Sequence, residues 1–76
     1  MEIGLHLLPL GKSGCVSSVD KNTMLYHRLE ELGLIPGTQV CCRYRTPGGE
    51  VTALEFRGTT IALRTRDMRT IRVHTD

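Results

Sequence analysis

The spacing of apolar residues changes once along the chain, from the period of a helix to the alternation that is typical of strands. Leu25, Leu29 and Leu32 recur at helical spacing and predict a short helix over residues 24–32. His27 would lie on the polar side of this helix, facing water. The sequence therefore predicts one amphipathic helix that covers a core with its leucine side.

Both ends of this helix are marked by residues that stop or cap helices. Asn22 or Thr23 can cap the first turn, because a short side-chain oxygen can accept a backbone N–H there. Gly33 suits the left-handed position after the last turn, and Leu34 can then fold back onto the helix. Residues 35–38, which contain proline followed by glycine, predict a type II turn that starts a new strand.

The alternating segments predict five short strands. They cover residues 15–19, 40–45, 51–57, a segment with Ile61 and Leu63, and a last segment with Ile71 and Val73. The side chains expected to point inward are Val40, Cys42, Tyr44, Leu54, Phe56, Ile61, Leu63, Ile71 and Val73. Those expected to point outward are Cys41, Arg43, Arg45, Arg64, Arg72 and His74.

The order of these elements predicts a mainly β fold with one helix inserted after the first strand. Residues 46–49 form a hairpin turn, and residues 65–69 a short connection. The four leucines between Leu5 and Leu10 must be tied to the core, since a loose tail would expose them. Closing so few residues into a small barrel would remove the exposed strand edges. With 76 residues we expect a single domain over 1–76.

The amino-acid composition says more about the cellular compartment of the protein than about its function. Three cysteines without a paired pattern indicate reduced thiols and a cytoplasmic protein. No apolar run reaches the roughly 20 residues of a membrane span, and no signal peptide is recognisable. The net charge of +2 is too small to identify nucleic acid as the partner. Seven of the eight arginines follow Thr38, where outward positions on strands account for most of them.

No set of residues indicates catalysis, and no cofactor is expected. The glycine-lysine-serine at residues 11–13 lacks the first glycine of a phosphate-binding loop, because His6 stands in its place. Neither a C-x₂₋₄-C nor an H-x₃₋₅-H pair is present, so no zinc motif is complete. Cys41 and Cys42 are adjacent on a strand and would point to opposite faces, so we expect no metal site there.

Three stretches together resemble the small ferrous iron transport protein A (FeoA-like) domains of bacteria. They are RLEELGLIPGTQV at residues 28–40, the hairpin TPGG at 46–49, and FRGTTIALRTRDMRTIRV at 56–73. The lead-in LLPLGKSGCVSSV at residues 7–19 is similar to the opening strand of that family.

The resemblance implies an SH3-like β-barrel that is not an enzyme. Such proteins are cytoplasmic accessories of a large ferrous iron permease that carries its own GTP-binding domain. Similar domains also end the chains of some metal-dependent repressors, but 76 residues leave no room here for a helix-turn-helix. The resemblance leaves weak self-association open.

The leading hypothesis is a protein-interaction module of ferrous iron uptake that binds the permease or its GTP-binding domain. The alternatives are a nucleic-acid-binding barrel and direct binding of a transition metal ion. We expect the partner in a groove where the helix crosses the barrel, with apolar residues inside and arginines on its rim. The residues expected to contact the partner are Met24, Leu25, Arg28, Leu34, Ile35, Arg43, Arg45 and Arg64.

Overall fold

The computed structural model describes all 76 residues and contains six strands and three short helical segments. In chain order these are β1 (Glu2–Gly4), a 3₁₀ helix (Leu5–Leu7), β2 (Ser13–Val19), α1 (Tyr26–Leu32), β3 (Gln39–Arg45), β4 (Val51–Phe56), β5 (Thr59–Arg64), α2 (Thr65–Met68) and β6 (Ile71–His74). No helix is long and apolar enough to cross a membrane. The mainly β architecture predicted from the sequence is confirmed.

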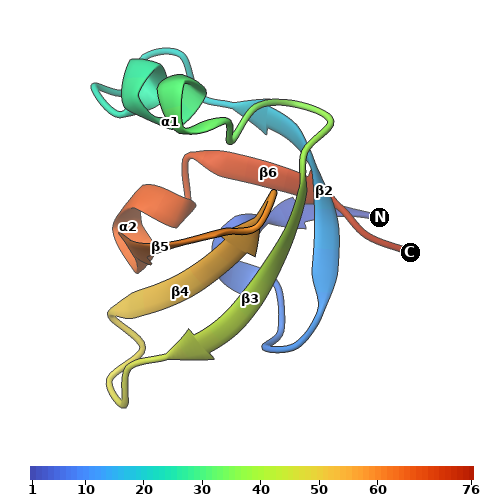
Figure 1. Cartoon of the computed structure of the whole chain (residues 1–76), viewed down its shortest axis with the longest axis vertical. Helices are drawn as coiled ribbons and strands as arrows, with labels where there is room; N and C mark the ends of the chain where they lie inside the picture. Colours follow the sequence, from blue (N-terminus) through green and yellow to red (C-terminus); the bar gives the residue numbers. More distant parts are fainter.

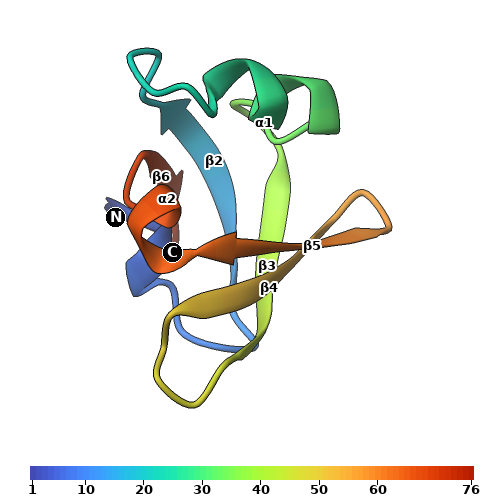
Figure 2. The same ribbon diagram turned by 90° about the vertical axis from the view of Figure 1, so that its left-hand side faces the viewer.

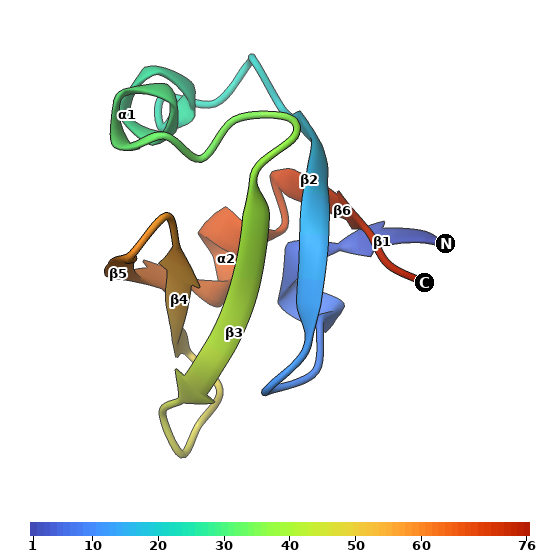
Figure 3. The same cartoon turned by 45° about the vertical axis from the view of Figure 1, so that its right-hand side comes forward.

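All six strands belong to one antiparallel sheet, in the order β1-β6-β2-β3-β4-β5. The sheet is strongly curved, with α1 above one end and α2 beside β5 (Figure 1). Figure 3 shows β2 and β3 side by side, with β4 and β5 on one flank and β6 and β1 on the other. The ladder is not closed, because β1 and β5 do not pair. Instead α2 contacts both β5 and the 3₁₀ helix, so a helical turn joins the two ends of the sheet.

The amino-terminal segment contributes a strand that the sequence did not predict. Ile3 of β1 lies opposite Val73 of β6, which makes β1 an edge strand of three residues. Leu5 and Leu8 are buried, so the expectation that the leucine-rich lead-in is tied to the core is confirmed for these two. A strand of three residues is too short for its alternation to be recognised in the sequence.

Helix α1 begins at Tyr26, two residues later than the predicted start at Met24. The hydroxyl of Thr23 accepts the backbone N–H of Leu25 at 2.8 Å, which holds a turn ahead of the helix. The N-cap residue of α1 is Leu25, and no side chain caps the helix, so the prediction that Asn22 or Thr23 caps the first turn is wrong.

The carboxyl end of α1 is the left-handed ending predicted from the sequence. Gly33 has φ of 95°, and its N–H donates to the carbonyl of Glu30 at 3.0 Å. The N–H of Leu34 donates to the carbonyl of Leu29 at 2.9 Å. These two bonds define a Schellman motif, so the prediction for Gly33 is confirmed.

The type II turn predicted after α1 is also confirmed, and it is hydrogen-bonded to β2. Thr38 donates its N–H to the carbonyl of Ile35 at 3.0 Å, and Gly37 has φ of 94°, as a type II turn requires. The hydroxyl of Thr38 donates to the carbonyl of Gly33 at 3.0 Å. Val16 of β2 then exchanges two backbone bonds with the turn, to Gly37 and Thr38. Helix end, turn and strand are thus one hydrogen-bonded unit.

The alternation predicted for β3 is interrupted after Cys42. Cys42 lies opposite Leu54, but Tyr44 lies opposite Ala53, so Arg43 is the extra residue of a β-bulge. A bulge reverses the faces of the residues that follow it. Tyr44 is 66% exposed, and its predicted place in the core is wrong.

The core is one cluster formed by the inward sides of the strands, α1, α2 and the lead-in. Its members are Leu5, Leu8, Val16, Val19, Leu29, Leu34, Val40, Cys42, Leu54, Phe56, Met68, Ile71 and Val73. Ile61 and Leu63 of β5 pack against the cluster but are only half-buried. Strand β5 is therefore less covered than its alternating sequence predicts.

A two-residue turn connects β4 to β5. Arg57 and Gly58 have φ of 51° and 76°, the positive values that a type I′ turn requires at both central residues. The turn thus includes Arg57, which the sequence pattern assigned to the strand over residues 51–57. As a result Phe56 and Thr59 face each other as the first cross-strand pair.

The Gly33 ending gives a first testable prediction. We expect Gly33→Val to lower the free energy of unfolding by more than about 1 kcal/mol, because a β-branched residue is strained at positive φ. A Cβ there would meet nothing closer than Arg57 Cδ at 3.8 Å, so strain and not a clash is responsible. Urea denaturation measures the difference. Gly48→Ala is the matched control, since Gly48 has no positive φ. Equal stability of wild type and Gly33→Val would contradict the assignment.

His6 gives a prediction about pH. Its Nδ1 atom is buried without a hydrogen-bond partner, and burial, followed by the charges of Arg69 and Arg45, lowers the pKa of this imidazole below its ordinary value of 6.5. The unfolded chain therefore binds the proton more readily, so stability falls as the pH drops from 6.5 toward the lowered pKa. We expect His6→Gln to lose less stability than wild type between about pH 7.5 and about pH 5, measured by urea denaturation at each pH. His27→Gln, on the exposed side of α1, should behave as wild type.

Candidate partner-binding site

A groove of about 330 Å³ lies between α1 and the outer strand β5, and α2 closes one end. It is lined by Leu25, Arg28, Leu29, Leu32, Ile61, Ala62, Leu63, Arg64 and Asp67. Six of these nine residues are apolar. Leu32 is 42% exposed, which is a large exposed fraction for a leucine on the side of a helix that faces a sheet. The groove is therefore lined mostly by apolar residues, and the chain itself does not fill it.

The amphipathic helix and the open sheet together produce this groove. Leu29 reaches the core and is buried, while Leu25 and Leu32 flank it on α1 and remain partly exposed. On the opposite wall Ile61 and Leu63 are half-buried because no further strand covers β5. Both walls are thus apolar as the sequence pattern predicts, but the gap between them follows from the open edge.

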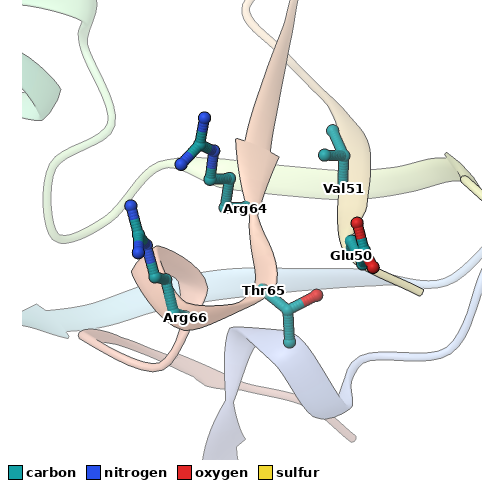
Figure 4. Close-up of a pocket in the computed structure, with 5 residues that line it drawn as sticks. All are labelled: Glu50, Val51, Arg64, Thr65 and Arg66. Carbon is teal, nitrogen blue, oxygen red and sulfur yellow. The ribbon is translucent and has the colours of Figure 1, made fainter. Parts of the chain in front are cut away.

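Arginines on the rim make the groove electropositive. Arg28 comes from α1 and Arg64 from the end of β5. Arg66 follows on α2 and lines a neighbouring pocket with Arg64, outside this groove. The ion pairs of the structure are Arg43–Glu55 and Arg72–Glu2, so none of these three arginines is paired. Figure 4 shows the guanidinium groups of Arg64 and Arg66 on the same side, turned away from Glu50. Asp67 is the one acidic residue of the groove.

The structure brings together three of the residues predicted to contact a partner. Leu25, Arg28 and Arg64 line the groove. Met24 precedes Leu25 and is 99% exposed, so it is available to a partner beside the groove without lining it. The groove thus lies on the β5 side of the helix.

Leu34 and Ile35 do not lie in the groove. Leu34 is only 1% exposed because the Schellman ending folds it into the core, so it offers a partner no surface. Ile35 is half-buried in the following turn. For Leu34 the same local signal that predicted the helix end should have predicted burial, since the residue after the glycine packs back on the helix.

The two arginines of β3 are already engaged within the chain. The side chain of Arg43 donates Nε to a carboxylate oxygen of Glu55 at 2.9 Å, and this bond raises the pKa of the Arg43 guanidinium. Arg45 was expected to point outward, but the bulge turns it toward the inner side. There its Nη2 donates to the carbonyl of Leu8 and its Nε to the hydroxyl of Thr52, each at 3.0 Å. Arg45 therefore holds the lead-in against the sheet.

Six groove residues were not among those predicted to contact a partner. They are Leu29, Leu32, Ile61, Ala62, Leu63 and Asp67. The apolar alternation assigned Ile61 and Leu63 to the core, and the pattern alone cannot distinguish a covered strand from a half-covered one. One feature of the sequence could have indicated the partial exposure of Ile61 and Leu63. Their strand is an edge strand of the sheet whenever the barrel does not close.

The thiols and imidazoles do not gather into a metal centre. No group of three or more His, Cys, Asp or Glu residues is placed to hold an ion. Cys42 is buried, and this burial raises the pKa of its thiol. Cys15 and Cys41 are half-buried and free.

Comparison with solved structures identifies the fold and a family. FeoA from Stenotrophomonas maltophilia in complex with zinc is 33% identical, with a TM-score of 0.83 over 93% of this chain and 88% of that one. It is described as a prokaryotic SH3 domain protein, with a suggested role as a ferrous iron transport activating factor. FeoA from Chlorobium tepidum is 26% identical, with a TM-score of 0.88 over 95% of this chain and 69% of that one. No curated protein sequence matches the chain.

A larger neighbour shares the fold alone. IdeR of T. acidophilum has a TM-score of 0.85 over 99% of this chain, at 21% identity, but the match covers only 34% of IdeR. The open six-stranded sheet with its two small helices is thus an SH3-like fold. The model of the FeoA domain matches residues 3–75, and the chain belongs to this family.

The inward position of Arg45 gives a prediction about stability. Arg45→Ala removes the donors to the Leu8 carbonyl and the Thr52 hydroxyl, and Thr52 is fully buried. We expect a loss of about 1–2 kcal/mol in the free energy of unfolding, because a buried acceptor without a donor is costly. Thermal and urea unfolding would measure it. Arg43→Ala is the control and should leave the melting temperature almost unchanged, since its ion pair is on the surface. Equal effects of the two changes would contradict this role of Arg45.

Proposed function

We propose that the chain is a cytoplasmic, non-enzymatic accessory of ferrous iron uptake that binds the GTP-binding domain of an iron permease through the groove between α1 and β5. The observation that carries the proposal is the groove itself, in which a half-exposed apolar floor is bordered by unpaired arginines. Interfaces place such apolar anchors at the centre and polar groups on the rim. Membership of the FeoA family supports iron uptake as the process.

The chemistry of the site supports binding and not turnover. The polar residues of the groove are two arginines and one aspartate, and the remaining six are apolar. No nucleophile stands beside a general base in it. A surface of this kind suits recognition of a protein that offers apolar side chains and carboxylates.

Leu32 and Met24 provide the test of this proposal. We expect Leu32→Asp, and to a smaller degree Met24→Asp, to weaken binding of the purified GTP-binding domain at least about tenfold, because the new carboxylate would be desolvated at an apolar contact. Leu10→Asp is the matched control, since Leu10 is similarly exposed, at 48% against 42% for Leu32, and lies outside the groove. Titration calorimetry measures affinity, and thermal unfolding checks that each variant folds.

Two results would overturn the proposal. One is equal affinity of wild type and both groove variants for the permease domain, together with unchanged ferrous iron uptake in cells. The other is retardation of RNA by the purified protein at about 0.15 M salt, which would favour the nucleic-acid-binding alternative. The exposed Tyr44 beside Arg43 would then be the first stacking position to change.

A further inference from the structure

Strand β5 has a free edge along its whole length. It pairs with β4 on one side and with no strand on the other, as Figure 2 shows. The N–H of Thr65 donates to the carbonyl of Glu50 at 2.8 Å, which makes these two residues a hydrogen-bonded pair. In an antiparallel ladder such pairs alternate with non-bonded ones, so Leu63 and Ile61 also bond to β4. The backbone N–H groups of the residues between them therefore point away from β4.

The residues with outward backbone groups are Thr60, Ala62 and Arg64. No backbone bond outside the strands and helices uses the N–H of any of the three. All six residues of β5 pair with β4 in unbroken register, without a bulge or a proline. Natural edges are normally short, bulged, charged or covered, because a regular free edge accepts another strand. β5 has one charged residue, at its end, and none of the other protections.

The opposite edge of the sheet is protected in two of these ways, since β1 is short and one of its residues, Glu2, is charged. Strand β1 has three residues, and the ammonium group of Met1 donates to the carbonyl of Thr75 at 2.7 Å. Glu2 of β1 is paired with Arg72 of β6 at 3.1 Å. The contrast singles out β5 as the edge on which a partner strand can be added.

The groove supplies side-chain contacts for such a strand. A segment added to β5 would run between β5 and α1, where its alternate side chains would face the half-exposed Leu25 and Leu32. Arg28 and Arg64 stand at the same groove without ion pairs. The charge complement of this site is an acidic segment, because Asp67 alone balances the two arginines.

We propose that β5 binds an extended segment of a partner protein, in which apolar and acidic residues alternate, by strand addition along its free edge. Backbone hydrogen bonds to Thr60 and Ala62 hold the segment, the apolar residues fill the groove, and the acidic ones meet the arginines. The identification of that partner as the iron permease rests on the proposed function, whereas the mode of binding follows from the edge itself.

A synthetic peptide tests the binding mode without the permease. The probe is a capped peptide as long as β5 in which valine and glutamate alternate, and the control peptide has lysine in place of glutamate. We expect the first peptide to slow hydrogen exchange of the Thr60 and Ala62 amides at least about tenfold, since a new strand would accept these hydrogen bonds. The amides of Ile61 and Leu63 should be protected with and without peptide. The lysine peptide should bind at least about tenfold more weakly.

Ala62→Pro and Ala62→Val form a matched pair of variants. Proline removes the outward N–H without removing a bond to β4, whereas valine keeps the N–H and suits a strand. We expect the valine–glutamate peptide to lose at least about tenfold in affinity for Ala62→Pro and to keep its affinity for Ala62→Val. Protection of Ile61 and Leu63 in the proline variant verifies that the β4–β5 ladder persists. Arg64→Glu, which leaves the backbone unchanged, should weaken the glutamate peptide and strengthen the lysine one.

Several outcomes would overturn strand addition. If the valine–glutamate peptide does not bind, β5 is not the binding site. The same conclusion follows if the peptide binds but protects only amides elsewhere in the chain. Protection of Thr60 and Ala62 that rises with protein concentration alone would assign the edge to a second copy of the chain. If the permease domain binds while leaving these amides unprotected and binds Ala62→Pro as wild type, the proposed function stands and strand addition fails. If the peptide behaves as expected and the permease domain does not bind, strand addition stands and the proposed function fails.

Discussion

The buried Thr38 fixes where α1 lies relative to the sheet. Its hydroxyl donates to the carbonyl of Gly33 at the end of the helix and accepts the N–H of Ile35, while the backbone of Thr38 bonds to Val16 of β2. One residue therefore ties the helix end, the turn and the second strand together. Because a buried polar group without a partner is costly, these bonds favour a single geometry for the segment. The separation between α1 and β5, and with it the groove, depends on this geometry.

The helix end and the turn could be predicted because all their determinants are adjacent in the chain. Gly33, Leu34 and Gly37 each act on residues only a few positions away, and each has its predicted conformation or contact. The role of Thr38 could not be foreseen in the same way. Its hydroxyl reaches back across the turn, whereas the sequence shows only a threonine before a strand, where its β-branched side chain is common for its strand propensity alone.

The bulge in β3 shows where a local pattern fails. Residues 40–45 alternate without interruption in the sequence, yet Arg43 is an extra residue and the later side chains change face. The partners that stabilise the changed face of Arg45 are Leu8 and Thr52, one of them far away in the chain. A contact between segments so distant leaves no trace in a short window of sequence. For the same reason the pattern assigned Tyr44 to the core.

Only one wall of the candidate site could be predicted from local sequence patterns. The helix contributes Leu25 and Arg28 through its own amphipathic pattern, and an outward Arg64 follows from alternation on β5. The other wall of the groove could not be foreseen, because Ile61 and Leu63 have the pattern of buried residues whether or not a strand covers them. Their partial exposure depends on the open ladder, which only the three-dimensional structure reveals.

Helix α2 gives the free edge of β5 one blocked end. Thr65 begins α2 directly after Arg64, and its hydroxyl is bonded to the carbonyl of Gly49, so the helical turn is fixed against the end of β5. A strand added along β5 could not continue past this end, because α2 begins there. Asp67 of α2 lines the groove at this end. The helical turn that follows β5 therefore gives the free edge a defined end, and a defined end sets the register in which a partner strand can bind.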